Sequence, residues 1–348
     1  MKTEIENAIE AGLLAMHQHR HDVTEYEYAV AVATFPAYGK RYETQTLHPV
    51  AVEQEYRRPV IGHAKEYIGF VDTIMVDTAK DGQKLIHLEH KSGARDADSN
   101  EIIVFNLSNV AEQPTFYDEA ADYNGERPSE HIYDYIKVCG LKPKRVPKGK
   151  TAEDLGTLAE IRTDGKYLGE HVSFQSRKKY EAEGLKENGE LYGIRVAQHI
   201  AANPDKYFSR KRGVLRTEAQ REEARQTMSQ VVTEMERAKQ DALNGMEAYY
   251  KNTGACFSYG SYCEYLPICE GKASADSDLY QQKDVSQKTV SYSRMGTWKS
   301  CRQKYKFKYL DGIQPVGKKA KALRLGSLIH LGLEVFYEEL MKQELSDE

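Results

Sequence analysis

The sequence predicts an α/β protein in which helices flank a β-sheet. Apolar residues recur at helical spacing near both ends of the chain and in its middle, whereas residues 26–91 contain short β-rich runs. The dipeptide Asp81-Gly82 separates the last two of these runs, which is a strong signal for a hairpin. The length of 348 residues fits two domain units or one domain with insertions.

The composition limits the class of protein. Hydrophobic residues make up 40% of the chain and charged residues 29%, which excludes a disordered chain and an integral membrane protein. The formal charge of −4 excludes a globally basic nucleic-acid coat, so any site for a polyanion must be local. The first residues, MKTEIENAIEAGLL, carry acidic groups where a signal peptide needs basic ones, and we therefore expect a cytoplasmic protein.

The first part of the chain carries the predicted sheet. A helix over residues 5–16 precedes four β-rich runs, EYAVAVATF, TLHPVAVEQEY, YIGFVDTIMVD and KLIHLEHK, which we interpret as an antiparallel meander. A helix over residues 109–123 completes a core unit of residues 1–123. Residues 124–213 show no clear periodicity, and we interpret them as an insertion of unknown role.

The second part of the chain is predicted to be mostly helical. Thr217 and Gln220 are typical of a capping box, and they begin a long helix within a unit of residues 214–270 that also holds a cysteine-rich segment. The polar stretch of residues 271–290 is typical of a linker. Residues 291–348 carry two further predicted helices.

Three charged side chains are predicted to meet on the β-rich runs. Asp72 lies in an apolar strand, and Glu89 and Lys91 lie two positions apart in the next strand, so they share one face. A hairpin would bring Asp72 opposite them. Two carboxylates can hold Mg²⁺ or Mn²⁺, while the ammonium assists a water molecule or neutralises charge on a phosphoryl oxygen. The spacing alone also fits an ordinary solvated strand face.

Four of the five cysteines are candidates for a metal centre. Cys256, Cys263 and Cys269 lie close together in sequence, and Cys301 follows further along. Four thiolates bind either zinc or an iron–sulfur cluster. Because the chain has no Cys-x-x-Cys knuckle of the kind that zinc ribbons use, we favour the cluster. Cys139 lies outside this set and is interpreted as a spare core thiol.

The charged cluster resembles a known motif. The motif begins with a glycine, two hydrophobic residues and Asp72, and it continues after a hairpin with Glu89-x-Lys91. This order of residues resembles the motif of the PD-(D/E)xK nuclease superfamily, in particular that of its RecB-like branch. That branch has a glutamine and, four positions later, a tyrosine on the next helix, and Gln113 and Tyr117 stand at that spacing. The resemblance implies a restriction-endonuclease-like fold, a mixed β-sheet flanked by helices. It also implies that the two acids hold the metal, the lysine assists the attacking water, and the glutamine and tyrosine position the substrate strand.

The cysteine segment extends this resemblance. Iron–sulfur members of the RecB-like branch use one cysteine from an early helix and three from a late segment of the form Cys…Cys-Pro-Tyr…Cys. The run CEYLPIC, from Cys263 to Cys269, resembles that late segment with glutamate at the proline position. The resemblance implies a structural [4Fe–4S] cluster held by the four cysteines.

The early segment of that branch is similar to the end of this chain. It reads Ser-x-Ser…Cys-Pro…Phe-x-x-x-Tyr…Gly-x-x-x-His…Glu, and the corresponding residues are Ser291, Ser293, Cys301, Tyr305, Tyr309, Gly326, His330 and Glu334. The resemblance implies that His330 helps to bind the catalytic metal and that the order of segments is circularly permuted. A truncated tandem copy and a domain-swapped oligomer are the alternatives. We favour permutation because no similar segment precedes Asp72.

A local basic segment offers a surface for DNA. Between Lys299 and Arg324, nine basic residues accompany one acid, and the interleaved aromatic side chains suit stacking with bases. A solvated basic helix is the alternative. A smaller basic run lies within residues 206–216. The residues expected to contact DNA are Lys299, Arg302, Lys304, Lys306, Lys308, Arg210, Lys211 and Arg212.

Together these features predict a Mg²⁺- or Mn²⁺-dependent deoxyribonuclease. We expect an exonuclease of DNA repair or recombination, with DNA as substrate and a helicase or recombination protein as partner. The chain is expected to be a monomer or a domain-swapped oligomer that does not contact a membrane. One alternative is a non-catalytic DNA-binding clamp within a complex with a helicase or recombination protein. Another is an RNA-processing enzyme with a structural zinc site.

Overall fold

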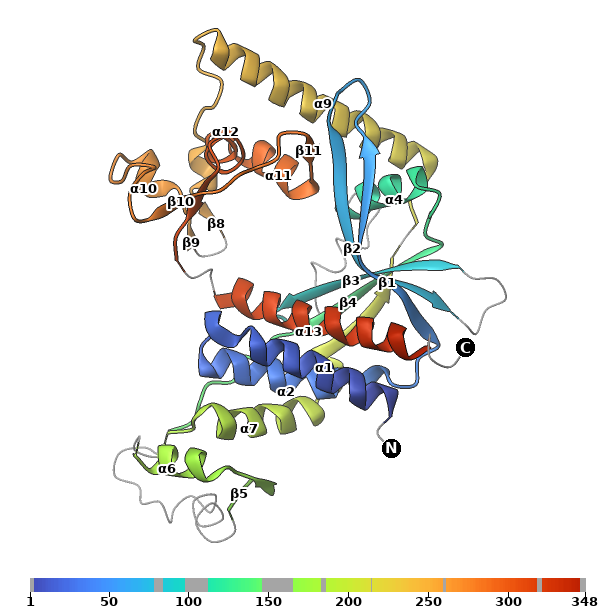
Figure 1. Cartoon of the computed structure of the whole chain (residues 1–348), viewed down its shortest axis with the longest axis vertical. Coiled ribbons are helices and arrows are strands. Elements are labelled where there is room, and N and C mark those ends of the chain that lie inside the picture. The colour runs from blue at the N-terminus through green and yellow to red at the C-terminus, as the bar shows by residue number, and fades with distance from the viewer. Residues whose placement is uncertain are drawn as a thin grey trace.

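The computed structural model describes residues 3–77, 84–97, 112–145, 165–182, 186–213, 215–258, 261–317 and 321–344. Its centre is a mixed β-sheet with the strand order β1-β2-β3-β4-β7, to which the short strand β11 adds beside β2 (Figure 1). The strands are β1 (Leu47–Pro59), β2 (Glu66–Asp77), β3 (Leu85–Gly93), β4 (Glu130–Lys137), β7 (Phe208–Arg212) and β11 (Thr289–Val290).

The strand directions explain why the sheet is mixed. β1, β2 and β3 are successive antiparallel neighbours, as the meander prediction requires. β3 and β4 are parallel, whereas β4 and β7 are antiparallel. A tight turn joins β1 to β2, and Gly62 within it has a φ of +79°, which favours glycine. The predicted turn at Asp81-Gly82 lies outside the described residues.

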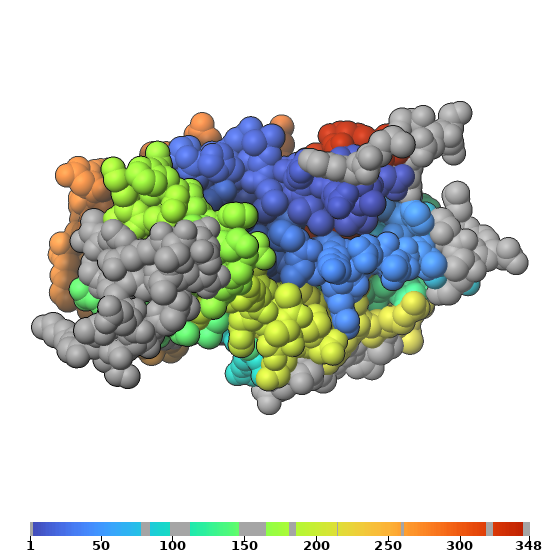
Figure 2. Space-filling model, turned by 90° about the horizontal axis from the view of Figure 1, so that it is seen from below, coloured from blue at the N-terminus to red at the C-terminus, as the bar shows by residue number. Residues whose placement is uncertain are grey.

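Three helices cover one face of the sheet. They are α1 (Glu4–Gln18), α2 (Glu25–Tyr42) and α13 (Lys321–Glu344). Although α1 and α13 come from opposite ends of the sequence, they pack side by side (Figure 1). Met75 and Leu88 of the sheet share a core with Leu333 and Phe336 of α13. The helix α7 (Gly189–Ala201) packs against α2, and Figure 2 shows this green segment beside the blue N-terminal helices.

The other face of the sheet is covered by a second group of helices. They are α4 (Glu112–Tyr123), α9 (Glu218–Leu243) and α11 (Tyr292–Ser300). Val71 and Ile74 of β2 share a core with Phe116, Val232 and Trp298 from these helices. α9 begins with the capping box that was expected from the sequence. The sheet is therefore flanked by helices on both faces, in agreement with the predicted fold class.

The cysteine segment and the residues after it form a smaller unit. Its elements are η3 (Thr253–Ala255), β8 (Phe257–Ser258), β9 (Ser261–Tyr262), α10 (Leu266–Cys269), β10 (Tyr280–Gln282), α12 (Arg302–Tyr305), the π-helical turn η4 (Lys306–Leu310) and β12 (Ile313–Pro315). β10 pairs with β12, and Tyr265, Tyr280 and Ile313 form a small core. The stretch interpreted as a linker, residues 271–290, thus contributes β10 and β11.

The remaining described elements are η1 (Arg20–Asp22), β5 (Lys166–Tyr167), β6 (Glu170–His171), α6 (Phe174–Ala182) and α8 (Pro204–Tyr207). Within the described ranges, no helix combines the length and apolar character that a bilayer crossing requires.

Two sequence predictions about the fold are wrong. The run EYAVAVATF is not a strand but the first half of α2, because Thr24 and Glu27 form a capping box that fixes the helix start and the intervening alanines favour a helix. Residues 124–213 are not an insertion as a whole, because β4 and β7 belong to the central sheet. β4 is buried almost throughout, so it lacks the alternating pattern that identifies a half-buried strand.

Candidate active site

The candidate site lies where β2 and β3 separate. Their antiparallel pairing ends at Thr73 and Leu88, and β11 pairs with β2 only further along, at residues 66–67. Asp72 and Glu89 are the residues that follow the last pair. The opening between the two strands therefore carries one acid on each side.

Local hydrogen bonds hold these two acids. Asp72 Oδ2 accepts a hydrogen bond from the backbone N–H of His90 at 2.6 Å. The Lys91 ammonium donates to Glu89 Oε1 at 2.5 Å, and the two side chains are only 29% and 12% exposed. Burial and the charge of Asp72 raise the pKa of Glu89, although Lys91 opposes this shift. Burial lowers the pKa of Lys91, but the two neighbouring acids outweigh it and raise that pKa, so the ammonium stays charged.

Helix α4 brings Gln113 and Tyr117 to the same opening. The Gln113 amide donates to Glu89 Oε1 at 3.3 Å and to the Tyr117 hydroxyl at 2.8 Å. Gly69 of β2 makes room for the tyrosine, because a Cβ at this position would lie 2.9 Å from the Tyr117 ring. Burial and the charge of Glu89 raise the pKa of Tyr117, so its hydroxyl remains a donor at neutral pH.

Helix α13 supplies His330 from the far end of the sequence. Its ring lies edge-on to the ring of His90, with centroids 6.2 Å apart. Burial, together with the charges of His90 and Lys91, lowers the pKa of His330 to about 4. The imidazole is therefore neutral at pH 7 and has a lone pair for a metal. One turn earlier, Gly326 allows α13 to approach β3, since a Cβ there would lie 3.0 Å from Ser92 Oγ.

Glu53 of β1 is an acidic residue at the site that the sequence analysis missed. Partial burial and the charges of Asp72, Glu334 and Glu89 raise its pKa to about 7. The register pairs residues 52 and 54 of β1 with residues 73 and 71 of β2, so Glu53 lies opposite Asp72. The available signal was the β1–β2 hairpin itself, because a turn centred at Gly62 gives this pairing directly.

A buried polar network supports His90 from within the protein. Asp134 of β4 accepts hydrogen bonds from His90 Nδ1 at 2.9 Å and from Arg210 Nε at 3.2 Å. Arg210 also donates to the hydroxyls of Tyr38 and Tyr337, at 2.8 and 2.6 Å. Although burial opposes it, Arg210 holds the pKa of Asp134 well below its usual range. The prediction that Arg210 contacts DNA is wrong, because its guanidinium is held inside the protein.

Most of the other predicted DNA-contacting residues form ion pairs with acids. Because acids distant in sequence neutralise part of the basic segment, its excess charge is smaller than the sequence suggests. Exposed pairs of this kind are weak, so a phosphate can replace the acid as partner of the basic side chain. Lys308 lies over the ring of Tyr309, and Lys211 lies on β7. The pairs are Lys299 with Glu112, Arg302 with Glu234, Lys304 with Glu264, Lys306 with Asp311 and Arg212 with Glu130.

The four predicted cysteine ligands lie in the smaller unit. The Cys263 backbone N–H donates to the carbonyl of Cys256 at 2.8 Å, and the Asn252 N–H donates to Cys301 Sγ at 3.4 Å. Burial raises the pKa of the Cys269 thiol, with smaller contributions from the other three thiols. In the described part of the chain, no three of these sulfur atoms lie within 4.8 Å of one another. Tetrahedral zinc requires sulfur atoms about 3.8 Å apart, so the thiols are spaced more widely than a zinc site needs.

The donors at the opening suit a hard divalent cation. Carboxylates of Glu53, Asp72 and Glu89 lie around the opening, and burial together with their mutual repulsion raises the pKa of Glu53 and Glu89. Among the residues that the structure describes, these donors form no group of three within 4.8 Å. Glu89 accepts hydrogen bonds from Lys91 and Gln113 instead, so Glu89 would have to exchange these partners for a cation in order to bind it.

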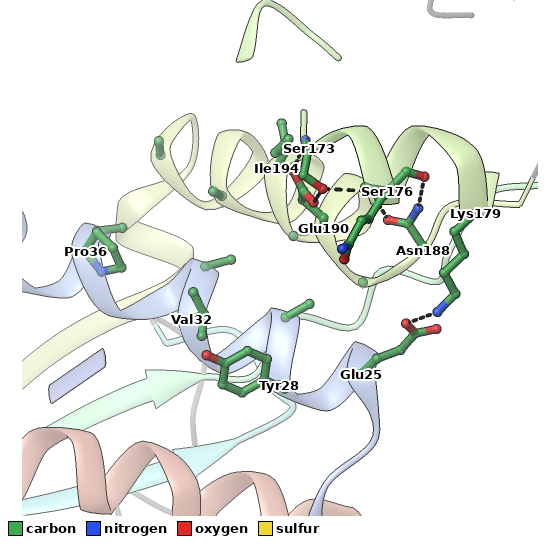
Figure 3. A pocket seen from close by; sticks show the side chains of 18 of the residues that line it. Glu25, Tyr28, Val32, Pro36, Ser173, Ser176, Lys179, Asn188, Glu190 and Ile194 are labelled. Carbon is green, nitrogen blue, oxygen red and sulfur yellow. Dashed lines mark hydrogen bonds and ion pairs between the residues drawn. The ribbon is translucent and has the colours of Figure 1, made fainter. Parts of the chain in front are cut away.

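A separate pocket of about 850 Å³ lies between α2, α6 and α7 (Figure 3). Several of its charged and polar groups are paired with one another, for example Lys179 with Glu25 and Ser173 with Glu190. Val32 and Ile194 belong to its largely apolar lining. None of the predicted site residues lines this pocket, which is therefore distinct from the candidate active site.

Comparison with known families adds one finding. The family model described as PD-(D/E)XK nuclease superfamily matches residues 289–348, less than a fifth of the chain. This segment contains Cys301 and His330. A mixed sheet flanked by helices is consistent with that superfamily, whose members are typically nucleases that use divalent metal ions. A search among curated proteins gave no match.

Proposed function

We propose that this chain is a Mg²⁺- or Mn²⁺-dependent deoxyribonuclease, an exonuclease of the RecB-like type. One observation carries the proposal. His330 belongs to the segment that the nuclease superfamily model matches, and its ring centroid lies 6.2 Å from that of His90, the residue between Glu89 and Lys91. Residues from the two ends of the sequence thereby contribute to one polar site.

The side chains have distinct roles in this proposal. Asp72 and Glu89, with help from His330 and Glu53, would hold the divalent cation, which stabilises the negative charge that develops during phosphodiester hydrolysis. Lys91 would leave Glu89 and orient the attacking water or neutralise a phosphoryl oxygen. Helix α4 would position the substrate strand through two hydrogen-bond donors, the amide of Gln113 and the protonated hydroxyl of Tyr117.

We further propose that the four cysteines hold a structural [4Fe–4S] cluster. The lack of a Cys-x-x-Cys knuckle in the sequence supports a cluster over a single zinc ion. A cluster at this position would fasten the segment around Cys263 to the helix after Cys301. That link would secure the C-terminal segment that carries His330.

The arrangement of segments supports circular permutation. Within a single chain, β11 pairs with β2, and α13 packs against α1 and the sheet. A domain-swapped dimer is not needed to complete the site. Under this proposal the active species is a monomer, and its native mass should equal that of one chain.

Cleavage of linear single- and double-stranded DNA tests the proposed function. The wild-type protein should degrade DNA only with Mg²⁺ or Mn²⁺ present. The Lys91→Met variant should lose about 10²–10⁴-fold in rate, because it keeps the side-chain length but not the ammonium. The control Lys84→Met, at an exposed position just before β3, should cleave like the wild type.

Two results would count against this assignment. Undiminished cleavage by Lys91→Met would exclude the proposed role of the lysine. Metal-independent DNA binding by the wild-type protein without any cleavage would instead support the non-catalytic clamp.

A further inference from the structure

Three buried side chains meet under α4, apart from the candidate active site. They are His87 of β3, His131 of β4 and Asp118 of α4, with exposed fractions of 2%, 6% and 4%. One ligand atom from each lies within 4.8 Å of the other two. The two histidines are direct partners in the parallel β3–β4 register, so adjacent strands project them side by side. Asp118 reaches them from the helix above.

Four polar atoms of this group have no hydrogen-bond partner among the described residues. Neither ring nitrogen of His87 makes a hydrogen bond, although the ring is buried between Tyr56 and His131. His131 Nε2 and Asp118 Oδ1 are 2.6 Å apart, yet neither atom makes a hydrogen bond with acceptable geometry. Buried imidazole nitrogens and carboxylate oxygens are normally satisfied, so a missing partner needs an explanation.

We propose that His87, His131 and Asp118 form a structural metal site for zinc. Two imidazoles and one carboxylate are donors that zinc prefers, and a solvent molecule would complete the tetrahedron. Adjacent ligand atoms around zinc lie about 3.3 Å apart, so modest side-chain rotations within the present spacing would close the site. A bound cation would satisfy one ring nitrogen of His87, together with His131 Nε2 and Asp118 Oδ1.

This site is separate from the one at the strand opening. His87 and Glu89 are two residues apart on the same face of β3, a separation of about 7 Å along the strand. The ligands join α4 to two central strands. Because α4 also carries Gln113 and Tyr117, the metal would fix the helix that borders the candidate active site. The site does not depend on the nuclease proposal.

Zinc binding to the whole chain tests the proposal. Protein stripped with a chelator is titrated with zinc chloride, and bound zinc per chain and the melting temperature are measured. The wild type should bind one more zinc ion than His87→Gln and should gain about 5 °C or more on zinc addition. The control His171→Gln changes an exposed histidine and should match the wild type. Equal zinc content in His87→Gln and the control would overturn the proposal.

Anomalous diffraction from zinc-equilibrated wild-type crystals gives a second measurement if His87→Gln does not fold. A peak at the zinc edge between the three side chains would support the site. Absence of a peak there would refute it. Neither measurement involves DNA cleavage, so failure of the nuclease proposal would leave this test intact.

Discussion

At the scale of residues, the candidate site combines groups whose charges are only partly balanced. Burial and like charges raise the pKa of Glu53 and Glu89, whereas burial lowers that of His330. The motif residues could be predicted because their spacing is local. Glu53 could have been found from the β1–β2 hairpin register, but Asp134 could not, because its position depends on pairing with a strand that is distant in sequence. Arg210 was misassigned for the same reason: nothing in its neighbouring sequence shows that Asp134 is its partner.

The buried imidazole of His330 predicts a specific pH dependence. In the folded state the pKa of His330 is about 4, below the ordinary value of 6.5. As the pH falls, the imidazole is therefore protonated at a higher pH in the unfolded state than in the folded state. This contribution to stability is present above pH 6.5 and is lost on acidification towards pH 4. Metal-free wild-type protein should therefore lose about 2 kcal/mol more than His330→Gln between pH 7 and pH 5. Urea unfolding at the two pH values measures this difference. Parallel losses in both proteins would show that the imidazole is solvated.

At the scale of elements, the contact between α1 and α13 attaches the C-terminal segment to the core. Helical periodicity predicted both helices and the capping box predicted the start of α9. Helical periodicity could not predict which helices pack together. The sequence of α2 was misread as a strand because its short apolar residues alternate as they do in a strand. The parallel β3–β4 pair was also missed, since a buried strand has no distinctive period.

The close approach of α1 and α13 can be tested at Gly12. A Cβ at this position would lie 2.7 Å from the Gly332 carbonyl oxygen and would also overlap the Phe35 ring. Gly12→Ala should therefore destabilise the protein by about 1–3 kcal/mol, despite the better helix propensity of alanine. In α11, a Cβ added at Gly296 would meet open space, so the control Gly296→Ala should be neutral or stabilising by up to about 1 kcal/mol. Chemical denaturation distinguishes the two outcomes, and equal effects would show that the helices are not in close contact.

At the scale of the whole molecule, the C-terminal segment is attached to the rest of the chain at three places. β11 extends the sheet, α13 covers one of its faces, and the cysteine segment packs against residues 280–315. The mixed sheet could be anticipated from the motif resemblance, whereas the cysteine site stays a prediction. The extent of the sheet could not, because β4 and β7 are separated by a long stretch of chain that shows no period.

The cysteine set predicts a visible chromophore. Cys301→Ala should lose the brown colour of anaerobically purified protein and melt at a lower temperature, because one of four proposed cluster ligands is removed. Cys139 is buried and accepts a hydrogen bond from the Tyr207 hydroxyl at 3.4 Å, apart from the other thiols. The control Cys139→Ala should keep the colour. A colourless wild-type protein that binds zinc at the four thiols would contradict the cluster assignment.

The shared active site is tested most directly by the rate of metal-dependent DNA cleavage in a double-mutant cycle. Asp72→Asn and His330→Gln should each reduce the rate by about 100-fold or more, and the double variant should be no slower than the slower single variant, because residues that act as a unit are not additive. The exposed His171→Gln variant should cleave like the wild type. Wild-type cleavage by His330→Gln, beside an inactive Asp72→Asn, would contradict a site built from both ends of the chain.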